Sequence, residues 1–347
     1  MIKKVLVIDD SALVRKVLVE EISKFADFSV VGSAVDPYDA REKIFQLRPD
    51  ILTLDLEMPR MNGLSFLAKL MKHHPLPVVV VSSQAPEGSK SAMAALELGA
   101  VEIVPKPGSQ FTVPDVGRKL IYALRAAASV PVEKLKISQL TAGKDNKPLK
   151  ISTRVFRTTH NLIAIGASTG GTQAIETVMS RMPVDAPGVV IVQHLPASFT
   201  GTFAKRLNQV SLMHVCEARD RDDITPGVAL VAPGDKHMVV TQNGTRYQVR
   251  IKNGPRVHFQ RPSVDVLFQS VAMNTGRNAV GVLLTGMGSD GAKGMLEMYE
   301  SGAHTIVQDE DTCIVFGMPK EAIKLGAADK VVSIGDITKT ALKMIED

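Results

Sequence analysis

Three residues in the second half of the sequence have the chemistry needed for acyl transfer: Ser168, His194 and Asp290. Ser168 lies in the run GASTG, which fits the G-x-S-x-G pattern in which small neighbours let a sharp turn expose a serine hydroxyl. A serine nucleophile needs a base that removes its proton, and that base needs a carboxylate that fixes its tautomer and stabilises its cation. The three residues match these roles, and we predict that they form a catalytic triad.

Each residue also has a simpler structural interpretation. Ser168 or Thr169 is well placed to cap a helix expected at 172–181, and Asp290 is well placed to cap one expected at 290–300. Serine, threonine and aspartate are common N-cap residues, so this alternative is favoured for any one of them taken alone. The catalytic interpretation is favoured only when all three residues are considered together.

A glycine-rich turn before a helix also suggests phosphate or dinucleotide binding. Here Ser168 occupies the second glycine position of G-x-G-x-x-G, and the next strand ends in Gln193-His194 where a ribose-binding acid is expected. This alternative is therefore weak. His237 and His258 are reserve candidates for the base, ranked below His194 because neither follows an expected strand end that faces Ser168.

The triad depends on the strands that carry it. The runs LIAIG, GVVIVQ, AVGVLL and AHTIV alternate with helical segments, which predicts a parallel sheet covered by helices. Ser168, His194 and Asp290 follow three of these strands, and the carboxyl ends of parallel strands gather at one edge of a sheet. The runs VALVA, HMVVT and YQVRIK surround Asn243-Gly244, a strong hairpin signal, so we expect an antiparallel hairpin extension of this sheet.

A second polar group lies in the first 125 residues. Five β-rich runs alternate there with amphipathic segments, which predicts a doubly wound parallel α/β domain of the (βα)5 type. Asp9 and Asp10 close the first strand and Asp55 closes the third. Grouped carboxylates suit Mg²⁺, which prefers hard anionic oxygen ligands. The simpler alternative is three surface aspartates that begin turns or cap helices.

Two more strand ends add to this acidic group. Ser82 ends the fourth strand and Lys106 ends the fifth. An acyl phosphate on Asp55 would need a metal and a lysine to neutralise its oxygens, and a hydroxyl to report its presence. The runs IDDSA, DLEMPRMNG, VVSS and VPKP resemble the receiver domain of response regulators. By that resemblance, Ser82 would be the switch hydroxyl and Lys106 the lysine beside the phosphate.

The same resemblance implies a metal site. Asp55 would accept the phosphoryl group, Asp10 would bind Mg²⁺ directly, and Asp9 would bind it partly through water. Glu57 would contribute its backbone carbonyl. Ile103 stands where many receivers carry an aromatic switch residue, so we expect the switch to act through repacking of the surface.

The order Ser, His, Asp differs from the Ser, Asp/Glu, His order of α/β-hydrolases. The C-terminal half resembles the catalytic domain of chemotaxis protein-glutamate methylesterases through IGASTGG, VIVQHLPASFT, VALVAPGDKHM, RPSVDVLF, LLTGMGSDGAKG and VFGMPKEA. This resemblance implies that Ser168 attacks a methylated glutamate of a chemoreceptor and releases methanol, and that a glutamine amide follows the same route. His194 would act as base and then acid, and Asp290 would orient it. Backbone N–H groups of Met287 and Thr169 would stabilise the oxyanion.

Length and charge suggest how these parts are joined. We expect a receiver domain at 1–125, a flexible basic linker at 126–157 and a methylesterase domain at 158–347. The linker holds seven basic and two acidic residues, so most of the net charge of +5 lies there and the flanking domains nearly balance. That distribution argues against a domain that reads nucleic acid. No run approaches the roughly 18 apolar residues that span a bilayer, so we expect a cytoplasmic protein without membrane insertion.

These observations give a set of expected partners and alternatives. We expect Mg²⁺ in the receiver and no cofactor for the esterase, a chemotaxis histidine kinase as phosphodonor, methyl-accepting chemoreceptors as substrates, and a monomer. One alternative is a receiver joined to a DNA-binding output domain, but the sequence lacks a short helix-turn-helix pattern. Another is a nucleotide-dependent oxidoreductase, which would bind a dinucleotide tightly.

Overall fold

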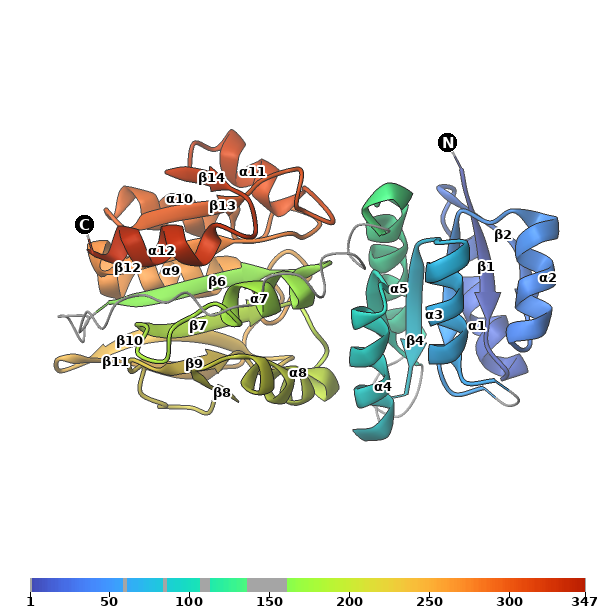
Figure 1. Ribbon diagram of the computed structural model, residues 1–347, viewed down its shortest axis with the longest axis horizontal. Helices are drawn as coiled ribbons and strands as arrows, with labels where there is room; N and C mark the ends of the chain where they lie inside the picture. Colours follow the sequence, from blue (N-terminus) through green and yellow to red (C-terminus); the bar gives the residue numbers. More distant parts are fainter. Residues whose placement is uncertain (1, 59–60, 84–85, 107–112, 136–160, 347) are drawn as a thin grey trace. The chain divides into compact units, whose positions relative to one another are not determined.

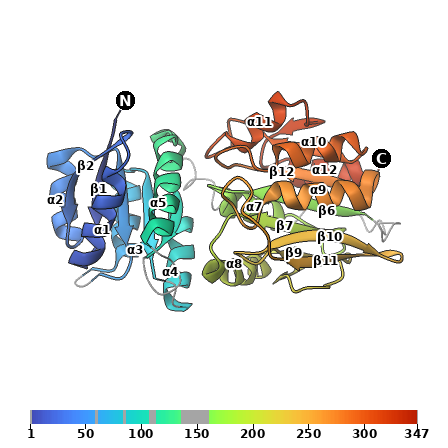
Figure 2. The ribbon, with the colours of Figure 1, turned by 180° about the vertical axis from the view of Figure 1, so that it is seen from behind.

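The structure, a computed structural model, describes residues 2–58, 61–83, 86–106, 113–135 and 161–346. It divides into two compact units, Met1–Lys144 and Asp145–Asp347. Each unit is an α/β sheet covered by helices, as Figures 1 and 2 show from opposite sides. Residues 136–157 of the expected linker lie outside the described residues.

The N-terminal unit is a five-stranded parallel sheet in the order β2-β1-β3-β4-β5. Helices α1 and α5 pack against each other, and α3 packs beside α4. This arrangement confirms the predicted doubly wound domain. Its elements are β1 (Lys3–Ile8), α1 (Ala12–Ser23), β2 (Phe28–Ala34), α2 (Pro37–Leu47), β3 (Ile51–Asp55), α3 (Gly63–His73), β4 (Val78–Ser82), α4 (Pro86–Glu97), β5 (Glu102–Pro105) and α5 (Val113–Ala128).

Helix boundaries in this unit follow local sequence signals. The side chains of Ser11, Asp36 and Asn62 accept hydrogen bonds from first-turn amides and so cap α1, α2 and α3. At the other end of the unit, α5 continues to Ala128, and Ala126 is fully buried. The first residues of the expected linker are therefore helical, because their apolar side chains still face the core.

The C-terminal unit contains a seven-stranded parallel sheet in the order β14-β13-β12-β6-β7-β9-β8. The predicted second parallel sheet is confirmed. Its elements are β6 (Leu162–Ala167), α7 (Gly171–Met179), β7 (Gly188–Gln193), α8 (Ala197–Val210), β8 (His214–Glu217), β9 (Val228–Val231), β10 (His237–Asn243), β11 (Arg246–Lys252), α9 (Val264–Thr275), η1 (Gly276–Asn278), β12 (Ala279–Leu283), α10 (Ala292–Glu300), β13 (His304–Gln308), α11 (Met318–Lys324), β14 (Lys330–Val332) and α12 (Ile337–Glu346).

The predicted hairpin forms, but it does not extend the main sheet. Strands β10 and β11 form a separate two-stranded antiparallel sheet joined by a turn that contains Gly244, which has a φ of 59°, and Gln248 of β11 also bridges to Asp223. The run VALVA, expected beside this hairpin, is instead β9 and pairs in parallel with β7 and β8. Its continuous apolar sequence is typical of a strand covered on both faces, which explains its place in the parallel sheet.

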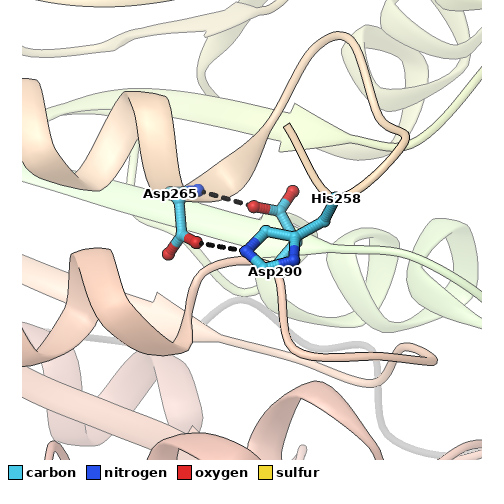
Figure 3. A group of neighbouring side chains, drawn as sticks. All are labelled: His258, Asp265 and Asp290. Carbon is cyan, nitrogen blue, oxygen red and sulfur yellow. Dashed lines mark hydrogen bonds and ion pairs between the residues drawn. The ribbon is translucent and has the colours of Figure 1, made fainter. Parts of the chain in front are cut away.

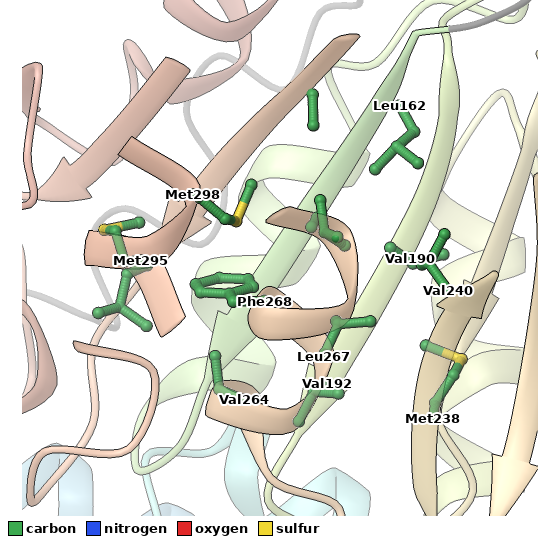
Figure 4. Close-up of a cluster of buried hydrophobic side chains, with 14 of the residues drawn as sticks. Leu162, Val190, Val192, Met238, Val240, Val264, Leu267, Phe268, Met295 and Met298 are labelled. Atoms are coloured by element: carbon green, nitrogen blue, oxygen red, sulfur yellow. The ribbon is translucent and has the colours of Figure 1, made fainter. Parts of the chain in front are cut away.

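The core of this unit lies between the parallel sheet and the helices on either side of it. Helices α9 and α10 pack together over β12, whereas α7 and α12 contact each other and the same sheet (Figures 1 and 2). Phe268 of α9 is fully buried in a cluster with Met295 and Met298 of α10 (Figure 4). This packing fixes the start of α9 relative to the carboxyl end of β12.

We expect Phe268→Ala to destabilise the C-terminal unit by about 3–5 kcal/mol, because it leaves a cavity between α9 and the sheet. Met273→Ala, on the same helix but 79% exposed, is the matched control and should change stability by less than about 0.5 kcal/mol. Denaturant unfolding followed by circular dichroism measures both. Equal midpoints for the two variants would show that Phe268 does not anchor α9.

Candidate active site

Three strand ends meet at the centre of the seven-stranded sheet. Strand β6 is flanked by β7 on one side and by β12 on the other. From this pair, the strands that follow β6 and those that follow β12 are added toward opposite edges of the sheet. Ser168 follows β6, His194 follows β7, and Asp290 lies in the loop between β12 and α10. Crevices outside the carboxyl ends of parallel strands, at such a reversal of strand order, are the usual ligand sites of open α/β sheets.

Ser168 lies in a tight, buried turn. Its backbone N–H donates to the carbonyl of Thr285 at 3.0 Å, and its own carbonyl accepts from the N–H of Gly171 at 2.7 Å. A Cβ atom on Gly286 would lie 2.7 Å from the Cβ of Ser168, so only glycine fits there. Helix α7 begins with Gly170 as its N-cap and has no side-chain cap. The capping alternative for Ser168 and Thr169 is therefore not adopted.

His194 and Asp290 are joined by a buried hydrogen bond. The Nε2 atom of His194 lies 2.8 Å from Oδ2 of Asp290, and both side chains are at least 90% buried. Among the described residues, Nδ1 of His194 has no hydrogen-bond partner. An ionised carboxylate can only accept, so Nε2 is the donor and Nδ1 keeps its lone pair. The ring is thus set to accept a proton at Nδ1.

Asp290 is held by the first turn of α9 rather than by its own helix. Its Oδ1 accepts from the Ser263 hydroxyl at 2.7 Å and from the Asp265 N–H at 3.0 Å, and its Oδ2 accepts from the Val264 N–H at 2.8 Å. Helix α10 begins after Gly291 and has no side-chain cap, so Asp290 does not cap it. Burial alone would raise the pKa of Asp290, but the His194 contact and these donors hold the pKa below its ordinary value.

The two reserve histidines have other partners. His237 bonds through Nε2 to the carbonyl of Pro255 at 2.9 Å, and its Nδ1 accepts from the N–H of Ser263 at 3.3 Å. Both of its nitrogens are occupied, so His237 is structural. His258 lies 3.0 Å from Asp265, with which it pairs (Figure 3). The ranking of His194 as the base agrees with this geometry.

His258, Asp265 and Asp290 lie close enough together to suggest a metal site, since one ligand atom of each falls within 4.8 Å of the others. Their hydrogen bonds argue against it. Both oxygens of Asp290 already accept two donors each, and those of Asp265 accept from His258 and from the N–H of Gly294 at 2.7 Å. A cation would have to displace these donors, so the cluster does not fit a metal ion.

The N-terminal unit contains a cluster of carboxylates that, unlike the cluster around Asp290, has the chemistry to hold a cation. Oxygens of Asp9, Asp10 and Asp55 lie within 4.8 Å of one another at the ends of β1 and β3. The Oδ1 atoms of Asp9 and Asp55 accept from the N–H groups of Ser11 and Glu57, at 2.9 and 3.1 Å. Their buried Oδ2 atoms face the same site and pair with a lysine side chain. These carboxylate oxygens, with Asp10 beside them, fit the hard-oxygen requirement of Mg²⁺.

Lys106 closes this acidic site. Its Nζ lies 2.7 Å from Oδ2 of Asp55 and 3.1 Å from Oδ2 of Asp9. Burial raises the pKa of both aspartates despite the lysine. Burial alone would lower the pKa of Lys106, but its contacts with Asp55 and Asp9 outweigh this effect and raise it. The predicted switch hydroxyl, Ser82, is buried and donates to the carbonyl of Gly88 in α4 at 3.2 Å, so it does not contact Asp55 here.

The sequence did not predict several residues that support these sites. Arg15 donates to the backbone carbonyls of Asp9 and Asp10, at 2.8 and 2.9 Å, and so fixes the turn that carries them. The side chain of Gln193 donates to the carbonyl of Ser168 at 2.8 Å. For Gln193, its place at a strand end beside His194 was the available signal. Nothing in the local sequence indicates the contacts of Arg15.

The fold and site geometry define a protein class: a receiver-type unit with an acidic strand-end site, and an α/β unit with a Ser/His/Asp group of the kind found in serine hydrolases. Comparison with known proteins narrows this class. Residues 163–341 match the family model described as CheB methylesterase, and residues 5–114 match the response regulator receiver domain. The chain belongs to the CheB methylesterase family and carries an N-terminal receiver domain.

Similar proteins cover nearly the whole chain. A protein-glutamate methylesterase/protein-glutamine glutaminase of Syntrophus aciditrophicus is 53% identical over 343 residues, which are 99% of each chain. One of Hydrogenovibrio crunogenus is 47% identical, again over 99% of each chain. The crystal structure of the Thermotoga maritima CheB methylesterase catalytic domain matches with a TM-score of 0.52 and 34% identity, over 55% of this chain and 99% of that one. The C-terminal match is to a methylesterase, so the DNA-binding alternative is not favoured.

Proposed function

We propose that this protein hydrolyses methyl esters of glutamate side chains on chemoreceptors and releases methanol, as part of chemotaxis adaptation. The observation that carries this proposal is the buried His194–Asp290 pair at the same sheet edge as the Ser168 turn. The printed names of the similar proteins support the substrate class. The same names support a second activity, the deamidation of receptor glutamines, because an amide carbonyl can be attacked in the same way as an ester carbonyl.

The proposed reaction gives each of the three side chains a separate role. As Ser168 Oγ attacks the ester carbonyl, Nδ1 of His194 takes the hydroxyl proton, and Asp290 stabilises the resulting cation through Nε2. The C–O bond to the methoxy group then breaks, and His194 gives its proton to the leaving methanol. Water attacks the acyl-enzyme with His194 again as base, which frees the glutamate and restores Ser168. With a glutamine substrate the leaving group is ammonia.

The developing oxyanion needs preorganised donors. We assign this role to the backbone N–H groups of Met287 and Thr169. Thr169 directly follows Ser168, and Met287 directly follows Gly286, whose Cα lies against the Ser168 side chain. The Thr285 hydroxyl donates to the carbonyl of Thr169 at 3.0 Å and so connects the two loops that would carry these donors.

Ser168→Ala, His194→Ala and Asp290→Ala should each lower methanol release by at least about 10⁴-fold, because the members of a triad act as a unit. Ser180→Ala is the matched control, since Ser180 is a buried serine whose hydroxyl only donates to the carbonyl of Thr177. Methanol release from methylated receptor measures all four variants. If a folded Ser168→Ala protein kept near-full activity, the covalent mechanism would be excluded.

In the N-terminal unit, we propose that Asp55 accepts a phosphoryl group from a chemotaxis histidine kinase. Asp9, Asp10 and Asp55 would hold Mg²⁺ together with the backbone carbonyl of Glu57, and the ion would supply positive charge to balance the acyl phosphate. The close grouping of carboxylate oxygens from Asp9, Asp10 and Asp55 supports this assignment. We propose no cofactor for the esterase.

Asp55→Asn should abolish Mg²⁺-dependent labelling by a small radioactive phosphodonor, because the amide cannot form an acyl phosphate. Asp27→Asn should label like the parent, since Asp27 is exposed and pairs only with Arg125 at 2.8 Å within the described structure. The label on the parent should be lost in acid or base as a carboxyl phosphate is. Acid-stable label of undiminished amount on Asp55→Asn would mean that the acceptor is a different residue.

We further propose that the receiver, at 1–125, restrains the methylesterase domain, at 158–347, across the basic linker 126–157. A phosphoryl group on Asp55 would attract the ammonium group of Lys106, which pairs with the unmodified Asp55 carboxylate in this structure. It would also offer Ser82 a stronger acceptor than the Gly88 carbonyl. Turning the Ser82 hydroxyl toward the phosphate would free the start of α4 and change the surface that α4 presents. The restraint would then be lost.

A truncated protein that begins at Thr158 should release methanol faster than the unphosphorylated full-length chain, and phosphorylation should raise the rate of the full-length chain toward that of the truncated protein. One methanol-release assay on the three samples measures this, with phosphodonor added to the truncated protein as a control that should change nothing. A truncated protein no faster than the unphosphorylated parent would contradict restraint. A gain on phosphorylation alongside that result would instead indicate positive activation.

We propose that the protein acts in the cytoplasm, as a monomer that binds no nucleic acid and is not inserted in the membrane. None of the described helices is both long and apolar enough to cross a bilayer.

A further inference from the structure

A second histidine–aspartate pair lies directly behind the proposed triad. His258 bonds to Asp265 at 3.0 Å, and the N–H of Asp265 in turn donates to Asp290 (Figure 3). Asp265 is a buried carboxylate, 3% exposed, and its oxygens lie within 4.8 Å of those of Asp290. The mechanism above uses Asp290 but leaves His258 and Asp265 without a role.

His258 is held in place by an unusual turn. The backbones of Val257 and Gln260 exchange hydrogen bonds of 3.0 and 2.8 Å, and the two residues between them, His258 and Phe259, have φ angles of 49° and 63°. Two positive φ angles in a two-residue turn normally require glycine or asparagine. Nonglycine residues held in this region are costly and tend to occur where a site needs a fixed side chain. Here the turn directs the imidazole at Asp265.

Two buried carboxylates this close together would compete for protons unless each had its own donors. Asp290 accepts hydrogen bonds from His194, from Ser263 and from two helix amides. Asp265 has the N–H of Gly294 and His258. The charged groups that face Asp265 in the described structure are His258 from the turn and Asp290 from the loop before α10. His258 is therefore the only charged side chain there that favours the ionised form of Asp265.

We propose that His258 is a positioning residue: by holding Asp265 ionised, it keeps Asp265 from donating a proton to Asp290 and so preserves the Asp290–His194 hydrogen bond. This inference rests on the proposed triad. Without His258, a protonated Asp265 would face the Asp290 carboxylate, which has an oxygen within 4.8 Å of one of its own and already accepts four hydrogen bonds. The new donor competes with His194 and reduces the negative charge that stabilises the histidine cation.

The effect has a defined pH dependence. Burial raises the pKa of Asp265 most and the nearby Asp290 raises it too, whereas the Gly294 N–H and His258 lower it. Removal of His258 therefore raises this pKa further. Asp265 is protonated below its pKa and ionised above it, so the defect should grow as the pH falls and fade as the pH rises. Substrate binding is untouched, so the loss should appear in kcat and not in KM.

The test compares His258→Ala with Phe259→Ala in the full-length chain, with phosphodonor and Mg²⁺ present in every assay. Both variants place alanine at a positive φ in the same turn, but the Phe259 side chain is 84% exposed, whereas that of His258 bonds to Asp265. We expect His258→Ala to lower kcat for methanol release by up to about tenfold at the acid end of the pH range in which the parent is active, the scale of one hydrogen bond to a charged group, and by less as the pH rises. Phe259→Ala should match the parent across the whole range.

A double-mutant cycle tests whether His258 acts through Asp265. Asp265→Asn should lower kcat by a similar factor at every pH, since the amide introduced there donates to Asp290 regardless of pH. Adding His258→Ala to it should lower kcat no further. Equal profiles for His258→Ala and Phe259→Ala, a change in KM alone, or additive losses would each overturn the inference. If Asp265→Asn does not fold, the pH profiles of the two turn variants decide alone.

Ser168→Ala, run in the same assay, separates the two proposals. If it releases methanol at the parent rate, the triad itself is wrong. If it is inactive while His258→Ala behaves like Phe259→Ala, the triad stands and only the role of His258 fails.

Discussion

The C-terminal site depends on one buried negative charge. Asp290 is removed from water at the centre of the unit, and a buried carboxylate is stable only when its oxygens are hydrogen-bonded or paired. The first turn of α9 supplies three donors and His194 supplies the fourth. The helix N-terminus adds a favourable dipole. The carboxylate therefore cannot rotate away without leaving donors and acceptors unpaired, and its orientation sets that of the histidine.

The rest of the unit can be understood as support for this arrangement. Packing of Phe268 against α10 fixes where α9 begins, and α9 in turn fixes the donors for Asp290. The parallel pairing of β12 and β7 with β6 brings the loops that carry Asp290 and His194 to the Ser168 turn. Gly286 permits the close approach of the β12 loop to Ser168. The acidic site of the N-terminal unit also lies at strand ends, and there Lys106 pairs with the buried carboxylates of Asp9 and Asp55.

Both sheets could be predicted from the sequence, because buried parallel strands are continuous apolar runs. The meeting of Ser168, His194 and Asp290 at one edge could be predicted too, because the carboxyl ends of parallel strands lie at the same edge. The local sequence also suggested that Asp290 caps the helix that follows it, α10. Asp290 instead accepts from the amides of Val264 and Asp265 at the start of α9, which lie some 25 residues away in the chain, and no local pattern links them to it. The position of β9 was not predicted for a similar reason. The run VALVA is apolar enough for either sheet, and which sheet it joins depends on strands that are distant in the sequence. His258 was predicted only as a reserve base, and its contact with Asp265 could not be predicted because it depends on a turn whose φ angles are unusual for its residues.

The central claim is that Asp290 fixes His194 with Nε2 as donor and Nδ1 as acceptor. The ¹⁵N chemical shifts of the His194 ring measure this directly in the resting protein at a pH where the ring is neutral. Our account predicts a protonated Nε2, an unprotonated Nδ1, and loss of this preference in Asp290→Ala. A ring protonated on Nδ1, or a tautomer unchanged in Asp290→Ala, would contradict it.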